Sequence, residues 1–461
     1  MPGPEAPRFG TSGLRGLVTA LTPDLVAAHV AGFLRTCDTG SQVLIGEDLR
    51  PSSRALAATV AATLAGAGVR PLRLGPLPTP ALALAAQTMG AGAIMVTGSH
   101  IPADRNGLKF YRRGGAEIDK TDEAALVAAA RTPAPPPGPA PRVDASLHTQ
   151  ALEAYVARYL DAFGARALAG LRLGFYAHSS VARDLLPDLL RRLGATVTEL
   201  GRTDNFVPVD TEAIEPDTQD RLRGWATGGF DAILSTDGDA DRPLLADETG
   251  AVIRGDILGA LTARYLKATH VVTPVTSITT LDAMGFAQVR RTRVGSPYVI
   301  AEMETLAPAR VIGFEANGGV LLGFDAPGLT ALPTRDAVLP LIVPLLAARE
   351  RPLSALVAAL PPRTALTERL QGIDRTRAEI WIASLAGTPA ARTALWDGSD
   401  TTLDLTDGVR MIHPGGALLH LRLSGNAPEL RIYAEASTAR AAQALLDRGC
   451  TEAQTQIGRS H

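Results

Sequence analysis

Short apolar runs alternate along the chain with alanine-rich stretches of helical periodicity. The apolar runs are 43–45, 93–96, 171–176 and 232–234, and the helices that the pattern predicts between them lie at 54–65 and 181–193. This alternation is typical of βαβ units, in which mostly parallel sheets are covered by helices. The pattern therefore predicts an α/β fold.

A proline-rich stretch marks the clearest domain boundary. Residues 132–141 contain six prolines and should form a stiff, extended connector. Weaker breaks fall near 250–256 and 351–362. The last part of the chain has an alternating strand pattern at 419–423, a second strand at 430–434 and a helix at 439–457, which predicts a smaller α+β domain. We therefore expect four domains, at 1–142, 143–249, 250–355 and 356–461.

Composition narrows the range of partners. The 461 residues are 46% hydrophobic, which is enough for several cores. The formal net charge is −2 and 20% of the residues are charged, so the composition does not indicate a basic surface. We therefore expect no nucleic-acid and no membrane partner. Residues 1–10 hold no apolar signal-peptide core, and no stretch reaches about 18 uncharged apolar residues. We expect a cytoplasmic protein.

The polar loop 97–109 follows the apolar run 93–96 and contains Ser99, His100 and Lys109. Ligands of open α/β sheets bind outside the carboxyl ends of the strands, so this loop is a candidate site. Neighbouring side chains in an extended loop point apart, so Ser99 and His100 are not expected to form a hydrolytic dyad. On local grounds alone, the alternative is a turn capped by Ser99 beside a surface histidine.

A second loop, Asp237-Gly-Asp239-Ala-Asp241-Arg242-Pro, also follows an apolar run. Three carboxylates at alternate positions repel one another unless a cation lies among them, which favours a hard divalent ion such as Mg²⁺. A calcium hand is disfavoured because Arg242 stands at position six, where the turn needs glycine. A merely solvated acidic loop is the remaining alternative.

Two further loops carry groups that suit a sugar phosphate. Glu315 and Asn317 could exchange hydrogen bonds with vicinal hydroxyls, although a plain glycine-rich turn fits the same residues. Nearer the carboxyl terminus, guanidinium groups flank a turn with a hydroxyl and a carboxamide, which would suit a phosphate cradle or, alternatively, a surface hairpin. The residues of that turn are Arg422, Ser424, Gly425, Asn426 and Arg431.

Together, the four loops resemble those of the α-D-phosphohexomutases, in the same order along the chain. The family forms are Thr-Ala-Ser-His-Asn-Pro followed by Asn-Gly-x-Lys, Asp-Gly-Asp-x-Asp-Arg, Gly-Glu-x-Ser-Gly and Arg-x-Ser-x-Thr-Glu-Pro-x-x-Arg. Segments 9–16, which includes Arg15, and 46–50 also resemble family signatures.

This chain departs from the family forms at several positions. Gly98 and Ile101 differ in the first loop, Phe314 is inserted in the third, and Asn317 replaces its serine. In the fourth loop Asn426 and Ala427 stand for threonine and glutamate, and a carboxamide can still bind a phosphate oxygen.

The resemblance implies three mixed-sheet α/β domains and a smaller α+β carboxyl-terminal domain around a central cleft. It implies a phosphoserine at Ser99, whose phosphate completes an Mg²⁺ site made by Asp237, Asp239 and Asp241. Arg15 and Arg242 would stabilise charge on the transferred group. His100 and Lys109 are the candidates for proton transfer, and the resemblance favours Lys109, whose pKa cationic neighbours could depress.

The remaining implied roles concern the substrate. Glu315 and Asn317 would bind the sugar, and the turn at 422–431 would bind phosphate. The expected reaction interconverts mannose 1-phosphate and mannose 6-phosphate through a hexose bisphosphate, which is phosphomannomutase activity. A phosphoglucomutase or an enzyme of dual specificity acting on glucose phosphates is the alternative, phosphoglucosamine mutase is disfavoured, and a non-catalytic sugar-phosphate sensor is the remote alternative.

Overall fold

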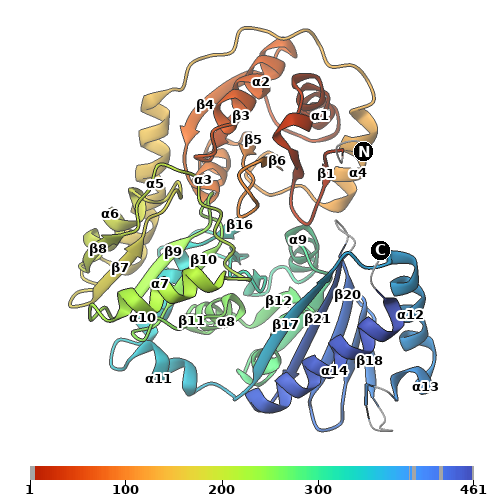
Figure 1. Ribbon diagram of the computed structural model, residues 1–461. Helices are drawn as coiled ribbons and strands as arrows, with labels where there is room; N and C mark the ends of the chain where they lie inside the picture. Colours follow the sequence, from red (N-terminus) through yellow and green to blue (C-terminus); the bar gives the residue numbers. More distant parts are fainter. Residues whose placement is uncertain (1–5, 394, 397–400, 425–428, 459–461) are drawn as a thin grey trace. The chain divides into compact units, whose positions relative to one another are not determined.

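The computed structural model describes residues 6–393, 395–396, 401–424 and 429–458. The chain divides into two compact units, Met1–Val272 with Gly295–Val357, and Thr273–Val294 with Ala358–His461. Its strands form four sheets, each packed with helices, so the fold comprises four domains that each combine a sheet with helices (Figure 1). Within the described ranges, no helix is both long and apolar enough to cross a membrane.

The first domain contains a six-stranded mixed sheet in the order β1-β2-β6-β5-β3-β4. Its strands are β1 (Arg8–Phe9), β2 (Leu14–Leu17), β3 (Gln42–Glu47), β4 (Arg70–Pro76), β5 (Gly92–Val96) and β6 (Arg105–Tyr111). Its helices are η1 (Val18–Ala20), α1 (Pro23–Thr36), α2 (Ser53–Gly66), α3 (Thr79–Met89) and α4 (Lys120–Ala129). Strands β3, β4 and β5 are parallel, and β6 runs antiparallel to both β5 and β2.

Strand alternation decides which side chains of the first domain enter its core. Leu108 and Phe110 of β6 pack with residues of α1, α2 and α4 in one apolar cluster. Since successive side chains of a strand point to opposite faces, Lys109 between them points away from that cluster. The alternation thus places a buried lysine on the face of the sheet opposite to this core.

The second domain has a mixed five-stranded sheet in the order β11-β10-β9-β7-β8. Its elements are α5 (Ala145–Phe163), β7 (Arg172–Tyr176), α6 (Leu185–Arg192), β8 (Thr196–Leu200), α7 (Pro216–Ala226), β9 (Ala232–Thr236), β10 (Pro243–Ala246) and β11 (Val252–Ile253). Strands β9 and β10 pair antiparallel, so the acidic loop is the connection of a hairpin.

The third sheet is also mixed, in the order β13-β12-β14-β15-β16. Its strands are β12 (His270–Pro274), β13 (Gln288–Thr292), β14 (Val311–Phe314), β15 (Val320–Leu322) and β16 (Leu332–Asp336). The helices of this part of the chain are α8 (Gly255–Tyr265), η2 (Thr279–Ala283), α9 (Ser296–Thr305), α10 (Val338–Ala347) and α11 (Leu353–Ala358).

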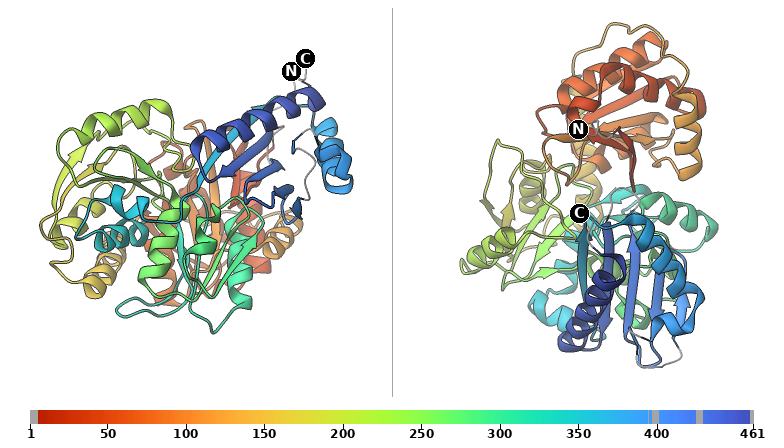
Figure 2. Two further views of the ribbon diagram at one scale, coloured as in Figure 1. Left: turned by 90° about the horizontal axis from the view of Figure 1, so that it is seen from below. Right: turned by 45° about the vertical axis from the view of Figure 1, so that its right-hand side comes forward.

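The fourth sheet is antiparallel in the order β17-β21-β20-β19-β18. Its elements are β17 (Thr364–Gln371), α12 (Arg375–Gly387), α13 (Pro389–Arg392), β18 (Thr402–Asp404), β19 (Val409–Ile412), β20 (Leu418–Leu423), β21 (Glu429–Ala436) and α14 (Ala439–Ile457). Helix α14 starts at a Thr438 cap and lies along one face of this sheet (Figures 1 and 2). This is the α+β domain that the sequence predicts.

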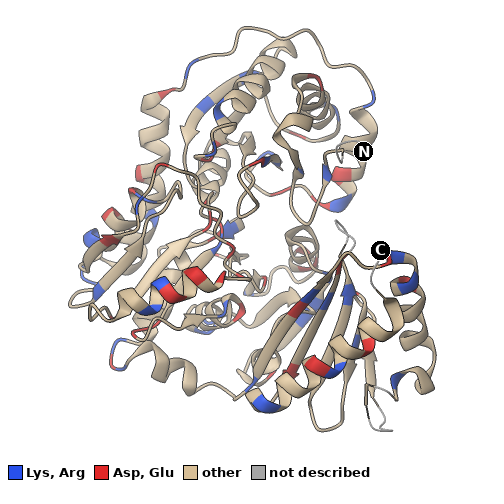
Figure 3. Ribbon diagram, in the orientation of Figure 1, with Lys and Arg blue, Asp and Glu red and all other residues tan. Residues whose placement is uncertain are grey.

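Most predicted elements are confirmed, with shifts of a few residues at their ends. The helix predicted at 181–193 is shorter, because residues 181–184 form turns before α6 begins at Leu185. The proline-rich stretch 132–141 has no helix or strand, as predicted. Acidic and basic residues are interspersed over the elements of the chain (Figure 3), in keeping with the small net charge.

Candidate active site

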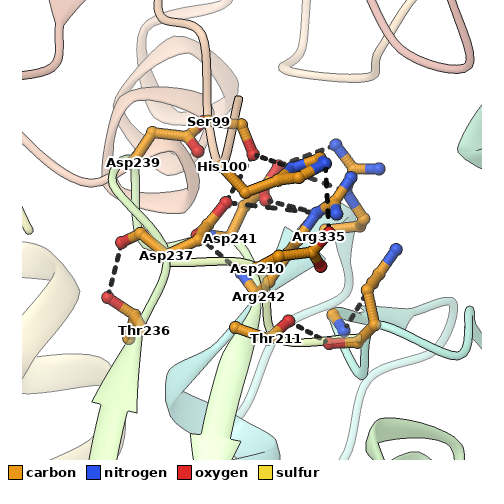
Figure 4. Close-up of polar contacts among 12 residues, drawn as sticks. Ser99, His100, Asp210, Thr211, Thr236, Asp237, Asp239, Asp241, Arg242 and Arg335 are labelled. Carbon is orange, nitrogen blue, oxygen red and sulfur yellow. Dashed lines mark hydrogen bonds and ion pairs between the residues drawn. The ribbon is translucent and has the colours of Figure 1, made fainter. Parts of the chain in front are cut away.

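Ser99 lies in the loop that follows β5, and its side chain is buried. Its Oγ donates a hydrogen bond to Oδ2 of Asp237 at 2.5 Å and lies 3.2 Å from Nδ1 of His100 (Figure 4). The prediction that Ser99 and His100 point apart is therefore wrong. It assumed an extended backbone, whereas Ser99 has φ 56, a left-handed conformation that turns the two side chains toward each other.

The side chain of Arg50 holds the serine loop through hydrogen bonds to the backbone carbonyl groups of the loop. The guanidinium donates to the carbonyl oxygens of Ser99 (3.0 Å), Ile101 (2.5 Å), Pro102 (2.7 Å) and Arg105 (3.0 Å). Because carbonyl groups buried without partners are costly, one arginine that satisfies four of them fixes the course of the loop.

Asp48 supports the same arrangement from the end of β3. It accepts hydrogen bonds from Nε of Arg50 at 3.2 Å, from Oγ1 of Thr97 at 2.7 Å and from the Gly98 amide at 3.2 Å. The departure at Gly98 has a steric reason, since a Cβ there would lie 2.5 Å from Cζ of Arg50. The segment 46–50 thus contributes the groups that shape the serine loop.

The acidic loop joins β9 to β10, and amides near its end donate hydrogen bonds to the side chain of its first residue, Asp237. Oδ1 of Asp237 accepts hydrogen bonds from the amides of Asp241 and Arg242, both at 3.2 Å. Asp237, Asp239 and Asp241 are buried, and one oxygen from each lies within 4.8 Å of the others. Strands flank the loop rather than the two helices of a calcium hand, which agrees with the rejection of that motif.

Lys109 reaches two of these carboxylates. Its Nζ donates to Oδ2 of Asp239 at 2.6 Å and to Oδ2 of Asp241 at 2.5 Å. A second cation is adjacent, because Arg335 donates to the same oxygen of Asp241. The cationic surroundings predicted for Lys109 are thus present, and its direct hydrogen-bond partners are the carboxylates of Asp239 and Asp241.

The carboxylates respond in opposite ways to this environment. Burial, followed by the charges of Asp239 and Asp241, raises the pKa of Asp237 well above its usual value. Although burial acts in the same direction on Asp241, the charges of Arg335, Lys109 and Arg242 lower its pKa. A bound divalent cation would relieve the repulsion from Asp239 and Asp241 that adds to the effect of burial on the pKa of Asp237.

The residues present fit such a cation. Among the described residues, Oδ1 of Asp239 and Oδ1 of Asp241 are buried without a hydrogen-bond partner. With an oxygen of Asp237 they supply anionic oxygen ligands from a single loop, and this donor set suits Mg²⁺.

Arg242 and Arg15 lie close to the aspartate cluster. Nε of Arg242 lies 4.0 Å from Oδ2 of Asp237 and 3.9 Å from Oδ1 of Asp241. Burial, followed by the charges of Arg242 and Arg335, lowers the pKa of Arg15 to about 10. Nη2 of Arg15 is buried without a hydrogen-bond partner among the described residues, so this end of the guanidinium can serve an anionic ligand.

His100 lies under the influence of these cations. Burial, followed by the charges of Arg242 and Arg15, lowers the pKa of His100 well below its usual value. The imidazole is therefore neutral at neutral pH, and Nδ1 can exchange a proton with Oγ of Ser99. Asp210 lies on its other side, with Oδ2 3.9 Å from Nε2.

Glu315 and Asn317 follow β14 and are buried. Nδ2 of Asn317 donates to Oε2 of Glu315 at 3.2 Å, and Oδ1 of Asn317 accepts from the Gly319 amide at 3.2 Å. Asn317 therefore closes its own turn and orients Glu315. Oε2 of Glu315 also accepts a hydrogen bond from Arg335, at 3.1 Å.

The predicted phosphate turn lies in the second compact unit, between β20 and β21. Arg422 and Arg431 are directly opposite each other on these strands. Arg422 pairs with Asp407 at 2.7 Å, Arg431 pairs with Glu429 at 2.8 Å, and the Ser424 amide donates to the Glu429 carbonyl. Gly425 and Asn426 lie outside the described residues.

Three polar residues of the site were missed by sequence reasoning. Thr79, at the start of α3, donates to Oδ2 of Asp239 at 2.7 Å, and Ser12 donates to Glu117. Arg335 of β16 contacts Asp241, Glu315 and Ser12. A signal was present for Arg335, because Thr334, Arg335 and Asp336 interrupt an otherwise apolar stretch before α10.

The chain is similar in sequence to known proteins. Residues 6–135, 153–250 and 254–364 match the family Phosphoglucomutase/phosphomannomutase, alpha/beta/alpha domains I, II and III respectively. A phosphomannomutase of Sinorhizobium fredii is 47% identical over 465 residues, covering 96% of this chain and 98% of that protein. A phosphomannomutase of Salmonella muenchen is 42% identical over 477 residues, covering 98% and 96%.

A solved structure gives the same result for the fold. A phosphoglucomutase/phosphomannomutase family protein from Burkholderia thailandensis has a TM-score of 0.76 and 21% identity, with 97% of each chain covered. The family matches span most of the chain, and the serine and aspartate loops that carry the resemblance meet in space, so the chain belongs to the phosphoglucomutase/phosphomannomutase family.

Proposed function

We propose that this protein catalyses the interconversion of mannose 1-phosphate and mannose 6-phosphate, with Ser99 as the phosphoryl carrier. It is an isomerase that works by phosphoryl transfer. The observation that carries the proposal is the 2.5 Å contact between Oγ of Ser99 and the carboxylate of Asp237, which brings a nucleophilic hydroxyl to a cation-binding cluster. The two phosphomannomutases described above support mannose phosphate as the substrate.

In the first transfer, phosphorylated Ser99 gives its phosphoryl group to a free hydroxyl of the hexose phosphate. The bond from phosphorus to Oγ of Ser99 breaks, and a bond from phosphorus to the sugar oxygen forms. Lys109 accepts the proton that the sugar hydroxyl loses. Neutral His100 relays a proton to Oγ of Ser99: its ring gives a proton from Nδ1, 3.2 Å from Oγ, and takes one from solvent at Nε2, so it stays neutral. The product is a hexose bisphosphate.

The second transfer uses the other phosphate of this bisphosphate after it has turned over in the site. Oγ of Ser99 attacks that phosphorus, His100 accepts the hydroxyl proton, and the sugar oxygen leaves with a proton from Lys109. Ser99 is phosphorylated again, and the phosphate has changed position on the sugar. Atoms and charge balance over the two steps without a further reactant.

Mg²⁺ held by Asp237, Asp239, Asp241 and the phosphate on Ser99 would neutralise negative charge on the phosphoryl oxygens. Arg15 and Arg242 add guanidinium donors for the same oxygens. Their positions beside the acidic loop suit this role, because phosphoryl transfer depends mainly on positioning and electrostatic stabilisation.

Substrate recognition is divided between two loops. Glu315 accepts hydrogen bonds from sugar hydroxyls through Oε1, since Oε2 is held by Asn317 and Arg335. The turn formed by Arg422, Ser424, Gly425, Asn426 and Arg431 binds the phosphate that is not being transferred.

The test compares initial rates with mannose 1-phosphate and glucose 1-phosphate, each with its bisphosphate as activator. We expect a higher kcat/KM for mannose 1-phosphate, and Ser99→Ala should abolish turnover and remove the phosphate from the intact-protein mass. Equal rates would establish dual specificity, and a preference for glucose would overturn the mannose assignment. Normal turnover by Ser99→Ala would remove Ser99 from the mechanism.

A further inference from the structure

Arg335 is a fully buried arginine that no motif of the sequence assigned to the site. Its side chain is 1% exposed, and it lies on β16 beside the acidic loop (Figure 4). Nε and Nη2 both donate to Oδ2 of Asp241, at 3.1 and 2.7 Å, and Nη1 donates to Oε2 of Glu315 at 3.1 Å. One guanidinium therefore joins the acidic loop to the sugar loop.

Two serines complete the surroundings of the guanidinium. Nη2 donates to Oγ of Ser12 at 3.2 Å, and Nη1 donates to Oγ of Ser296 at 3.3 Å. Both serines in turn donate to the carboxylate of Glu117. The planar fork of Arg335 is thus fixed from both sides, by the two functional carboxylates and by this serine pair.

Arg335 binds only one oxygen of each of the two functional carboxylates, Asp241 and Glu315. Asp241 has one oxygen occupied by Arg335 and Lys109, and its Oδ1 has no hydrogen-bond partner among the described residues. Glu315 has Oε2 occupied by Arg335 and Asn317, while none of the hydrogen bonds within the described ranges involves Oε1. Arg335 therefore decides which oxygen of each carboxylate remains available.

Close packing of the backbone around Arg335 restricts the movement of this residue. A Cβ at Gly319 would lie 2.4 Å from the Asp241 carbonyl oxygen and 3.0 Å from Cβ of Arg335, so a glycine is required where the two loops meet. The next residue on β16, Asp336, points to the opposite face, where it accepts hydrogen bonds from Tyr155 and Tyr159. The strand is thus anchored on both faces.

We propose that Arg335 is a positioning residue that orients the metal-binding carboxylate of Asp241 and the sugar-binding carboxylate of Glu315 at the same time. This inference rests on the proposed function and adds that metal affinity and sugar affinity depend on one side chain. A lysine cannot replace it, because a single ammonium group lacks the planar fork that reaches both carboxylates.

The experiment compares Arg335→Lys with the wild-type enzyme. We measure the Mg²⁺ concentration for half-maximal activity, the KM for mannose 1-phosphate and, on dephosphorylated protein without substrate, the dissociation constant of Mn²⁺ as a spectroscopic probe of the carboxylate cluster. We expect each constant to rise about tenfold or more, as when a residue that orients a metal ligand is lost.

Arg158→Lys serves as the matched control, because Arg158 is also buried but donates its described hydrogen bond to Thr330. It should leave all three constants unchanged. Ser296→Ala is the second variant, since it removes one acceptor of Arg335 and keeps every charge. It should raise the same constants by a smaller factor, and it keeps the proposal testable if Arg335→Lys fails to fold.

Several outcomes would overturn the proposal that Arg335 positions both carboxylates. A lower melting temperature with unchanged constants in the Arg335 variant would make Arg335 a purely structural ion pair and overturn the proposal. A rise in KM alone, or in the metal constants alone, would also overturn it, because the two carboxylates would then be oriented independently. If the wild-type enzyme shows no mutase turnover, the proposed function fails, whereas the Mn²⁺ titration still tests the positioning of Asp241.

Discussion

Replacing Gly98 with alanine tests whether Arg50 sets the conformation of the serine loop. The new Cβ would lie 2.5 Å from Cζ, 2.6 Å from Nε and 2.8 Å from Nη2 of Arg50. Since non-bonded carbon atoms prefer separations of about 3.5–4.0 Å, the guanidinium must retreat by about 1 Å. Its hydrogen bonds to the loop carbonyls, at 2.5 to 3.0 Å, do not tolerate such a shift.

The magnitude follows from this geometry. Overpacking of a tightly packed site costs about 1–3 kcal/mol, which corresponds to a fall of about 3–9 °C in the melting midpoint of a domain of this size. Turnover should fall about tenfold to a hundredfold, because the displacement is transmitted to Ser99, and a misplacement of about 1 Å can cost that much. The assays are calorimetric unfolding and kcat with mannose 1-phosphate.

Gly224→Ala is the matched control. Gly224 lies in α7, and a Cβ added there would meet no heavy atom within 4 Å, so alanine should keep kcat and raise stability by up to about 1 kcal/mol. Wild-type melting and wild-type kcat for Gly98→Ala would refute the reasoning, because Arg50 would then not be holding the loop at Gly98.

Three further outcomes are expected. Asp239→Asn should lower Mg²⁺ affinity and turnover together, since it removes an anionic oxygen from the cluster, and full activity of the wild type in excess chelator would contradict this. Arg431→Ala should weaken hexose-phosphate binding by about 1.5–3 kcal/mol, measured as KM at matched Ser99 phosphorylation, and an unchanged KM and kcat would leave the turn as a surface hairpin. Burial lowers the pKa of His178 to about 4 in the folded protein, whereas a histidine in the unfolded chain has a pKa of about 6.5. As the pH falls, the unfolded chain therefore takes up a proton first. The free energy of unfolding should drop by up to about 3 kcal/mol between about pH 6.5 and about pH 4. His178→Asn, which tolerates the left-handed backbone at this position, should flatten that dependence of the melting temperature, and an unchanged slope would exclude His178 as its source.

The sequence by itself determined the fold class and the loops that carry the chemistry. Ser99 and Asp237 could be placed just beyond the carboxyl ends of strands, because each follows a short apolar run and such a run is a local property of the sequence. The motif spacing likewise favoured an oxygen-ligated divalent cation. These inferences needed no knowledge of which strands pair with which.

Tertiary structure decided how the loops meet. Ser99 and Asp237 are 138 positions apart, and only the packing of two domains brings them to 2.5 Å. The left-handed backbone at Ser99 depends on hydrogen bonds from Arg50 and on space left by Gly98, so a local assumption of an extended loop gave the wrong orientation of His100.

Arg335 shows the limit of sequence reasoning most clearly. Its neighbours in the sequence indicate only a polar interruption before an apolar helix. Its partners Asp241, Glu315 and Ser12 come from three separate segments, and their distances to the guanidinium are set by sheet register and domain packing. That interruption does not reveal the partners of the buried charge, because the free energy that keeps it buried arises only when the domains are assembled.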